Sequence, residues 1–163
     1  MEKFEKTPSQ VAALLERWFH KYVAEGREPE NFGLFTGLPA EVQQQLISLM
    51  ALPVREIPVF VLTVTADRFV VNTTERFLLI ADAAVESLAY TDFHSHSGYL
   101  HLSPSEEGEH HVKAEGRQQD FKMLKNDGTA VIWSIATGRA GFKFWNVTKK
   151  CDIIGRKYII RED

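Results

Sequence analysis

The feature that most constrains the fold is a succession of strand-like segments between residues 57 and 136. They are rich in β-branched and aromatic residues, and turns of only two or three residues separate the first three of them. Asn126-Asp127-Gly128, between the last two segments, is typical of a hairpin turn. Connections this short join antiparallel neighbours. The sequence therefore predicts an antiparallel meander of about seven strands, over residues 57–65, 68–72, 76–81, 85–92, 99–102, 120–125 and 129–136.

Two helices are predicted before these strands, and the first has a well-marked start. Thr7 supplies a capping hydroxyl, Pro8 suits the first helical position and Gln10 can complete a capping box. An apolar stripe with helical spacing follows, and Gly26 is expected to end the helix. Because this stripe must be covered, the helix is expected to pack on the sheet or on another chain. The stripe consists of Val11, Leu14, Leu15, Trp18, Phe19, Tyr22 and Val23.

The second of these helices follows a loop, and a third helix is predicted after the strands. Residues 26–38 are predicted to be a loop, and Pro39 is expected to open the second helix. Its apolar face consists of Val42, Leu46, Leu49 and Met50. The C-terminal segment, residues 138–163, suits either a helix or a strand. The spacing of its apolar residues favours a helix from about Arg139 to Ile154, ended by Gly155.

These elements predict an α+β protein with a helical extension over residues 1–52 and a β domain over residues 53–163. The length of 163 residues suits one ordinary domain with an extension and is too short for a (β/α)₈ barrel, which needs roughly 200 residues. The composition, 44% hydrophobic and 25% charged, is that of a globular protein. The single cysteine, Cys151, excludes an internal disulfide and is expected to be a buried, inert thiol.

Residues 60–71, 75–80 and 85–93 follow one another as a strand, a short turn and a strand, and then a strand with small, polar and aromatic residues that ends in Asp and an apolar residue. This pattern resembles bacterial PH-like and GRAM-like domains over roughly residues 57–155. The resemblance implies an antiparallel barrel or bent sheet of about seven strands, closed by a C-terminal helix. It also implies a non-catalytic binding or interaction module, and it supplies no catalytic residues.

Histidines form the most distinctive polar group in the sequence. On a strand, His94 and His96 would project to the same face together with Asp92, where they could bind Zn²⁺ or another divalent ion. Residues 92–97 are also similar to the first metal motif of PHP-type phosphoesterases, which implies a small metal-dependent hydrolase as the alternative function. No second ligand group can be matched in the rest of the chain, so no metal site is expected and the histidines are interpreted as part of a solvated turn. The group consists of His94, His96, His101, His110 and His111.

Basic residues gather at the C-terminal end of an otherwise acidic chain. Residues 139–163 carry seven Lys or Arg residues against three acidic ones, while the whole chain has a net charge of −3. Lys143, Lys149 and Lys150 are candidate ligand-binding residues, because lysines interleaved with aromatic residues can bind an acidic partner or anionic lipid headgroups. The alternative is an ordinary amphipathic element whose lysines face water. The acidic remainder of the chain opposes a membrane and favours a protein partner.

Other function classes find little support in the sequence. The chain lacks a phosphate-binding glycine loop and a nucleophile motif, and its acidic balance argues against nucleic acid. The absence of a long apolar run or an apolar leader predicts a cytoplasmic protein without stable membrane insertion. We therefore expect a non-catalytic binding or interaction module without a cofactor. A protein partner or self-association is expected, and the sequence specifies no small-molecule ligand.

Overall fold

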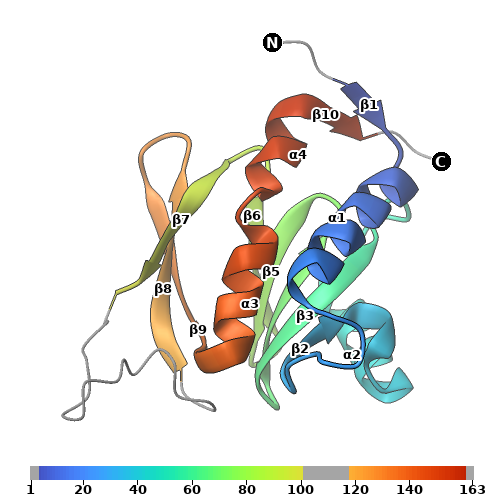
Figure 1. Ribbon diagram of the computed structural model, residues 1–163, viewed down its shortest axis with the longest axis vertical. Helices are drawn as coiled ribbons and strands as arrows, with labels where there is room; N and C mark the ends of the chain where they lie inside the picture. The colour runs from blue at the N-terminus through green and yellow to red at the C-terminus, as the bar shows by residue number, and fades with distance from the viewer. Residues whose placement is uncertain (1–3, 101–117, 161–163) are drawn as a thin grey trace.

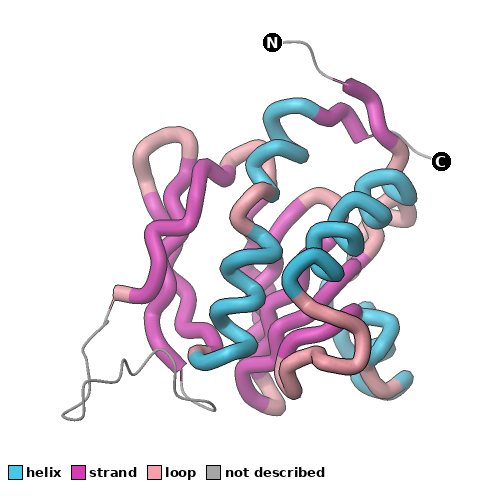
Figure 2. Tube along the Cα trace, in the orientation of Figure 1, coloured by secondary structure: helices cyan, strands magenta, loops and turns pink. Residues whose placement is uncertain are grey.

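The structure is a computed structural model that describes residues 4–100 and 118–160, and it shows an α+β fold (Figure 1). Figure 2 distinguishes its helices from its strands along the same trace. The described elements, in chain order, are β1 Phe4–Lys6, α1 Pro8–Tyr22, β2 Phe32–Leu34, the 3-10 helix η1 Phe35–Gly37, α2 Ala40–Met50, β3 Pro58–Thr65, β4 Arg68–Thr73, β5 Arg76–Ala81, β6 Ala84–Ala89, β7 Phe93–Tyr99, β8 Gln118–Lys125, β9 Ala130–Ala136, α3 Gly138–Thr148, α4 Cys151–Lys157 and β10 Tyr158–Ile160.

The ten strands of the described residues form three separate sheets, none of which closes into a barrel. β2 to β6 make a five-stranded antiparallel sheet in chain order, and β7 to β9 make a three-stranded antiparallel sheet. β1 and β10 pair in parallel, which brings the two ends of the described chain together. The expectation of one barrel or bent sheet of about seven strands, closed by a single helix, is therefore wrong.

Several observed strands differ from the predicted ones, and each difference has a physical reason. β1, β2 and β10 have three residues each, which is too short to show an alternating pattern, and β2 lies inside the segment predicted to be a loop. The sequence predicts a turn around His94 and His96 because His94 to Gly98 are polar or small, whereas these residues belong to β7. Between β6 and β7 the chain changes sheets, and Asn126 holds this corner by donating hydrogen bonds to the carbonyls of Thr91 and Asp92, each at 2.9 Å.

The start of α1 is as predicted, whereas its end is not. The Gln10 amide donates to the Thr7 hydroxyl at 3.2 Å, and the Gln10 side chain accepts from the Thr7 amide at 3.0 Å. The helix ends at Tyr22 because Val23 adopts an extended backbone. Gly26, with a φ of +80°, lies in the following turn instead of ending the helix. The stripe packs into the core of the same chain through its buried residues Val11, Leu15, Phe19 and Val23.

The C-terminal segment forms two helices, α3 and α4, in place of the single predicted helix. Lys149 and Lys150 lie between the two helices, and the chain leaves helical geometry at Lys150, whereas Lys149 keeps helical dihedral angles. Gly155 lies inside α4 and does not end it. A Cβ atom at Gly155 would collide with the carbonyl of Tyr90, so glycine allows α4 to approach the end of β6 closely. No helix in the described part of the chain is both long and apolar enough to cross a membrane.

Two apolar layers cover the two faces of the five-stranded sheet. On one face, α1 and α3 lie side by side over this sheet, and α3 also borders the three-stranded sheet (Figure 1). The core between these elements is built around aromatic side chains. These side chains include Phe19, Phe32, Phe60, Phe77, Phe93, Phe121, Trp133 and Phe144. On the other face, Leu46 and Met50 of α2, together with Phe35 of η1, cover apolar residues of β3, β4 and β5. The main core therefore holds α1 and α3 side by side, which positions the surface described next.

Candidate functional site

The two histidines of β7 lie in different surroundings. The Nε2 atom of His96 lies 2.8 Å from the Thr148 hydroxyl, and its imidazole packs among aromatic rings. His94 is exposed and contacts Ser95, and Asp92 is exposed in the turn before the strand. The sequence predicts that His94 and His96 project to the same face of a strand, and this prediction is wrong. Register shifts in the pairing of β7 with β8 interrupt the simple alternation of side chains. The rings around His96 are Phe77, Phe93, Phe121, Phe144 and Trp145.

The structure does not assemble Asp92, His94 and His96 into a set of metal ligands. Within residues 4–100 and 118–160, no three His, Cys, Asp or Glu side chains gather closely enough to hold a metal ion. Burial lowers the pKa of His96 to about 3, as expected for an imidazole enclosed by aromatic rings. His101, His110 and His111 lie outside the described residues. Asp92, His94 and His96, the predicted ligands of the alternative hydrolase, therefore do not form one site in the structure.

The three candidate lysines of the C-terminal segment meet the end of α1. The Lys149 ammonium lies 5.1 Å from the centre of the Tyr22 ring, and the Lys21 ammonium lies 5.6 Å from it. Lys143 donates a hydrogen bond from Nζ to the Tyr22 carbonyl at 2.6 Å. Lys150 follows Lys149, and its positive charge also acts on the Tyr22 hydroxyl. We call Lys21, Tyr22, Lys143, Lys149 and Lys150 the Tyr22 cluster.

The ends of the helices explain how this cluster forms. The last carbonyls of a helix lack partners within the helix, and Lys143 of α3 satisfies that of Tyr22, the last residue of α1. In the same way, Arg139 donates to the carbonyl of Arg27, in the loop after α1, at 2.7 Å. Lys149 and Lys150 form the junction between α3 and α4, where both are exposed. Lys143 therefore joins the two helices, whereas Lys149 and Lys150 present their charges to solvent.

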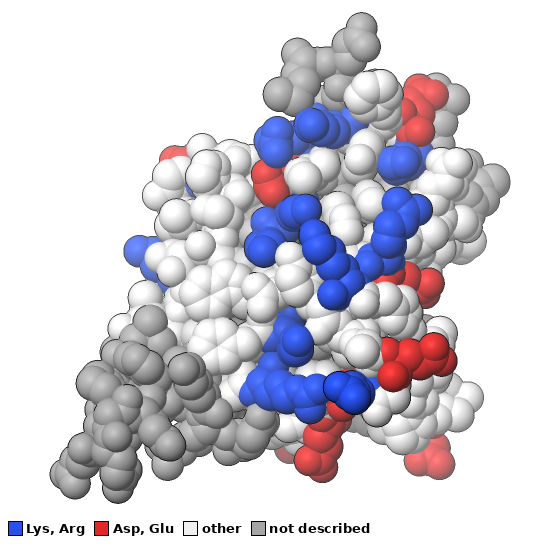
Figure 3. All heavy atoms as spheres, in the orientation of Figure 1, with Lys and Arg blue, Asp and Glu red and all other residues white. Residues whose placement is uncertain are grey.

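The surface around Tyr22 is electropositive. A hydrogen bond from Lys149 and the charges of Lys149, Lys21 and Lys150 hold the pKa of the Tyr22 hydroxyl below its usual value. None of the four lysines forms an ion pair with a carboxylate in the described part of the chain. Figure 3 shows Lys and Arg atoms gathered in a band over the face that α1, α3 and α4 form, with Asp and Glu mostly at its margins. Such a surface attracts negatively charged groups.

Comparison of the chain with protein-family models, with curated proteins and with solved structures finds no match in any of the three. The resemblance to PH-like and GRAM-like domains therefore stays a prediction. Function must be argued from the geometry of the chain itself.

Sequence reasoning found the lysines of the C-terminal segment but missed their partners on α1. Tyr22 belongs to the predicted apolar stripe of the first helix, and Lys21 lies beside that stripe without a distinguishing pattern. In the structure, Tyr22 is only partly buried, and the Lys149 ammonium lies over the face of its ring. The sequence signal that could have indicated these two residues is an aromatic residue next to a lysine in the last turn of an amphipathic helix.

Proposed function

We propose that the protein is a non-catalytic interaction module that binds an acidic segment of a protein partner on the Tyr22 cluster. The observation that carries this proposal is the group of exposed lysines around Tyr22 that lack carboxylate partners in the described residues. A glutamate or aspartate of the partner would supply the missing negative charge. The Tyr22 ring offers an apolar surface beside that charge, which suits a peptide better than a free anion.

A protein partner is favoured over an anionic membrane. The first 138 residues carry twelve basic and nineteen acidic residues, and their field opposes a close approach to a negative lipid surface. The basic residues of the cluster come from α1, from α3 and from the junction after α3, and they form no run of four or more basic residues in the sequence. We therefore expect negligible binding to phosphatidylserine vesicles at physiological salt.

The proposal is tested by fluorescence anisotropy with a labelled peptide of alternating glutamate and apolar residues. A peptide with glutamine in place of glutamate serves as the ligand control. Exposed ion pairs contribute up to about 1 kcal/mol each, so the double variant Lys149→Glu/Lys150→Glu should weaken binding by about tenfold. The variant Lys122→Glu/Lys125→Glu makes the same change of charge on β8 and should bind like the unaltered protein.

Salt and vesicles separate the possible outcomes. Binding of the acidic peptide should weaken as ionic strength rises, because the lysines are exposed. Equal binding of the glutamate and glutamine peptides would contradict the proposal. Strong retention on phosphatidylserine vesicles at physiological salt, abolished in Lys149→Glu/Lys150→Glu, would identify a membrane as the partner and refute the assignment to a protein.

A further inference from the structure

A cavity of about 410 Å³ opens between α4, β10 and the turn that joins β4 to β5. It shares no residue with the Tyr22 cluster. Ile154 and Ile160 contribute apolar wall, while Arg55, Glu75 and Arg76 contribute charges. Small-molecule sites combine apolar walls with a few polar groups in this way, and this volume lies at the lower end of their range. We call it the α4 cavity.

A buried ion pair fixes the position of Arg76. The side chain of Glu56 has an exposed fraction of 0%, and Arg76 donates to both of its carboxylate oxygens, from Nε at 2.8 Å and from Nη2 at 2.7 Å. The Thr73 hydroxyl donates to the same carboxylate at 2.5 Å. Burial raises the pKa of Glu56, but the hydrogen bonds from Arg76 and Thr73 outweigh it and hold that pKa below its usual value. A charged Glu56 thus fixes the guanidinium plane.

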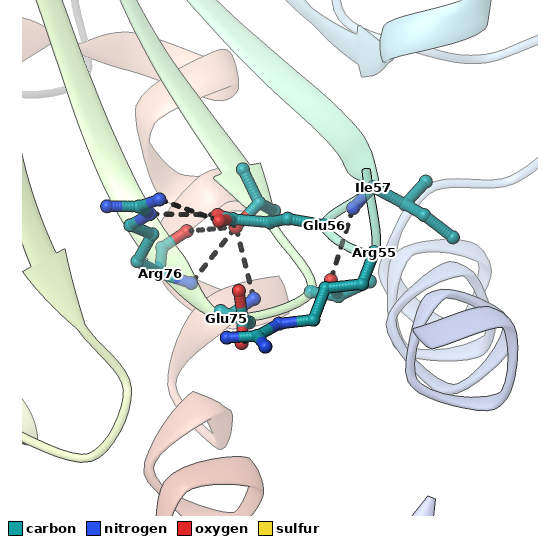
Figure 4. Close-up of polar contacts among 7 residues, drawn as sticks. Arg55, Glu56, Ile57, Glu75 and Arg76 are labelled. Atoms are coloured by element: carbon teal, nitrogen blue, oxygen red, sulfur yellow. Dashed lines mark hydrogen bonds and ion pairs between the residues drawn. The ribbon is translucent and has the colours of Figure 1, made fainter. Parts of the chain in front are cut away.

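Arg76 keeps donors available after this pairing. Figure 4 shows that its remaining terminal nitrogen points away from Glu56. The side chain is 31% exposed, and no hydrogen bond from that nitrogen is found among the described residues. A guanidinium with a free edge, held in place by a buried carboxylate, is prepared to bind a second carboxylate.

Glu75 and Arg55 place opposite charges beside this donor. The Arg55 guanidinium lies beside the Glu75 carboxylate (Figure 4), with Nε 3.5 Å from Oε1. Both side chains are in part open to solvent. Such exposed pairs contribute little stability, so each member can turn to a ligand at small cost. Burial and the neighbouring Glu56 raise the pKa of Glu75, and an added cation next to its carboxylate would stabilise the charged form.

We infer that the α4 cavity binds a free α-amino acid with an apolar side chain. Its carboxylate would accept hydrogen bonds from Arg76 and Arg55, and its ammonium group would donate to Glu75. The side chain would lie against Ile154 and Ile160. A simple anion would be repelled by Glu75, and a simple cation by the two arginines, whereas a zwitterion satisfies both sets of charges.

The inference is tested by ¹H–¹⁵N correlation spectra of the full chain during a titration with L-leucine. Saturable shifts should appear at residues that line the α4 cavity, with a Kd of about 1 mM or below. N-acetyl-L-leucine lacks the cation, L-leucinamide lacks the carboxylate and glycine lacks the side chain, so each should bind at least about tenfold more weakly. This ligand series uses the unaltered protein and does not depend on the folding of any variant.

Variants of the protein then test whether Glu75 binds the ammonium group of the ligand. Glu75→Gln should weaken L-leucine binding by about tenfold, and Glu86→Gln, on the exposed strand β6, should leave it unchanged. Dispersed spectra without ligand verify that both variants fold. The inference is overturned if L-leucine causes no saturable shifts, if the shifts lie away from the cavity, or if N-acetyl-L-leucine or L-leucinamide binds as tightly as L-leucine.

Discussion

His96 should make the stability of the protein fall as the pH falls from neutral to mildly acidic. Thr148 donates its hydroxyl proton to the carbonyl of Phe144 at 2.8 Å, so His96 Nε2 must be the donor toward Thr148. The neutral imidazole therefore carries its proton on Nε2. The other nitrogen, Nδ1, is buried and has no partner in the described structure. A proton added there would create a buried cation among aromatic rings, with no acceptor.

The magnitude follows from the pKa of His96 in the two states. Burial lowers this pKa from 6.5 to about 3 in the folded protein, whereas the unfolded chain keeps the ordinary value. Between these two values the unfolded state binds a proton that the folded state does not, so stability falls as pH falls below about 6.5. One pH unit corresponds to about 1.4 kcal/mol, which gives a loss of about 2 kcal/mol between pH 7.5 and pH 5.

The variant His96→Phe isolates this contribution. Phenylalanine fills the aromatic site, and the Thr148 hydroxyl keeps its bond to Phe144, so at pH 7.5 the free energy of unfolding should change by about 1 kcal/mol or less. At pH 5 the variant should avoid the loss of about 2 kcal/mol that the unaltered protein suffers. Urea unfolding at the two pH values measures both quantities. The control His94→Gln, which removes the exposed imidazole of the same strand, should behave like the unaltered protein.

The reasoning is refuted if His96→Phe loses as much stability between pH 7.5 and pH 5 as the unaltered protein does. That result would mean that His96 accepts its proton in the folded state and that β7 opens to water around it.

Three stability predictions concern packing and turns, each measured by urea unfolding. Leu15→Ala should cost about 2–5 kcal/mol because Leu15 is fully buried in the core; a change near zero would show that α1 does not pack there. Gly128→Val should cost more than about 1 kcal/mol because Gly128 has a φ of +88°; an unchanged midpoint would refute the turn. Gly155→Ala should cost about 1–3 kcal/mol through its collision with Tyr90, and unchanged stability would contradict the close approach of α4.

Local signals in the sequence predicted the elements that have local causes. Thr7 and Gln10 cap α1, and Pro39 precedes α2, because these residues act on their immediate neighbours. The turn at Gly128 is likewise set by its own backbone. Sheet membership is not local, since the chain changes sheets at Thr91 through hydrogen bonds to residues more than thirty positions away. The barrel was wrongly predicted because turn lengths specify neighbours along the chain and not where one sheet ends.

In the candidate sites, too, the sequence indicates local features but not contacts between distant segments. The excess of basic residues in the C-terminal segment indicated Lys149 and Lys150. Their association with Tyr22 depends on α1 and α3 packing side by side in the core. Nothing in the sequence marked Glu56 as buried, because a glutamate next to an arginine usually lies in water. Its burial depends on the pairing of β4 with β5, which presents Arg76 opposite the segment that precedes β3.

The central claim, that the Tyr22 cluster is the binding surface, is tested most directly by mapping the peptide onto the chain. ¹H–¹⁵N spectra would be recorded during titration with the alternating glutamate peptide at physiological salt. We expect the largest shifts at Lys21, Tyr22, Lys149 and Lys150, and we expect these shifts to disappear in Lys149→Glu/Lys150→Glu while Lys122→Glu/Lys125→Glu retains them. Shifts that concentrate on another surface, or that persist unchanged in Lys149→Glu/Lys150→Glu, would contradict the claim.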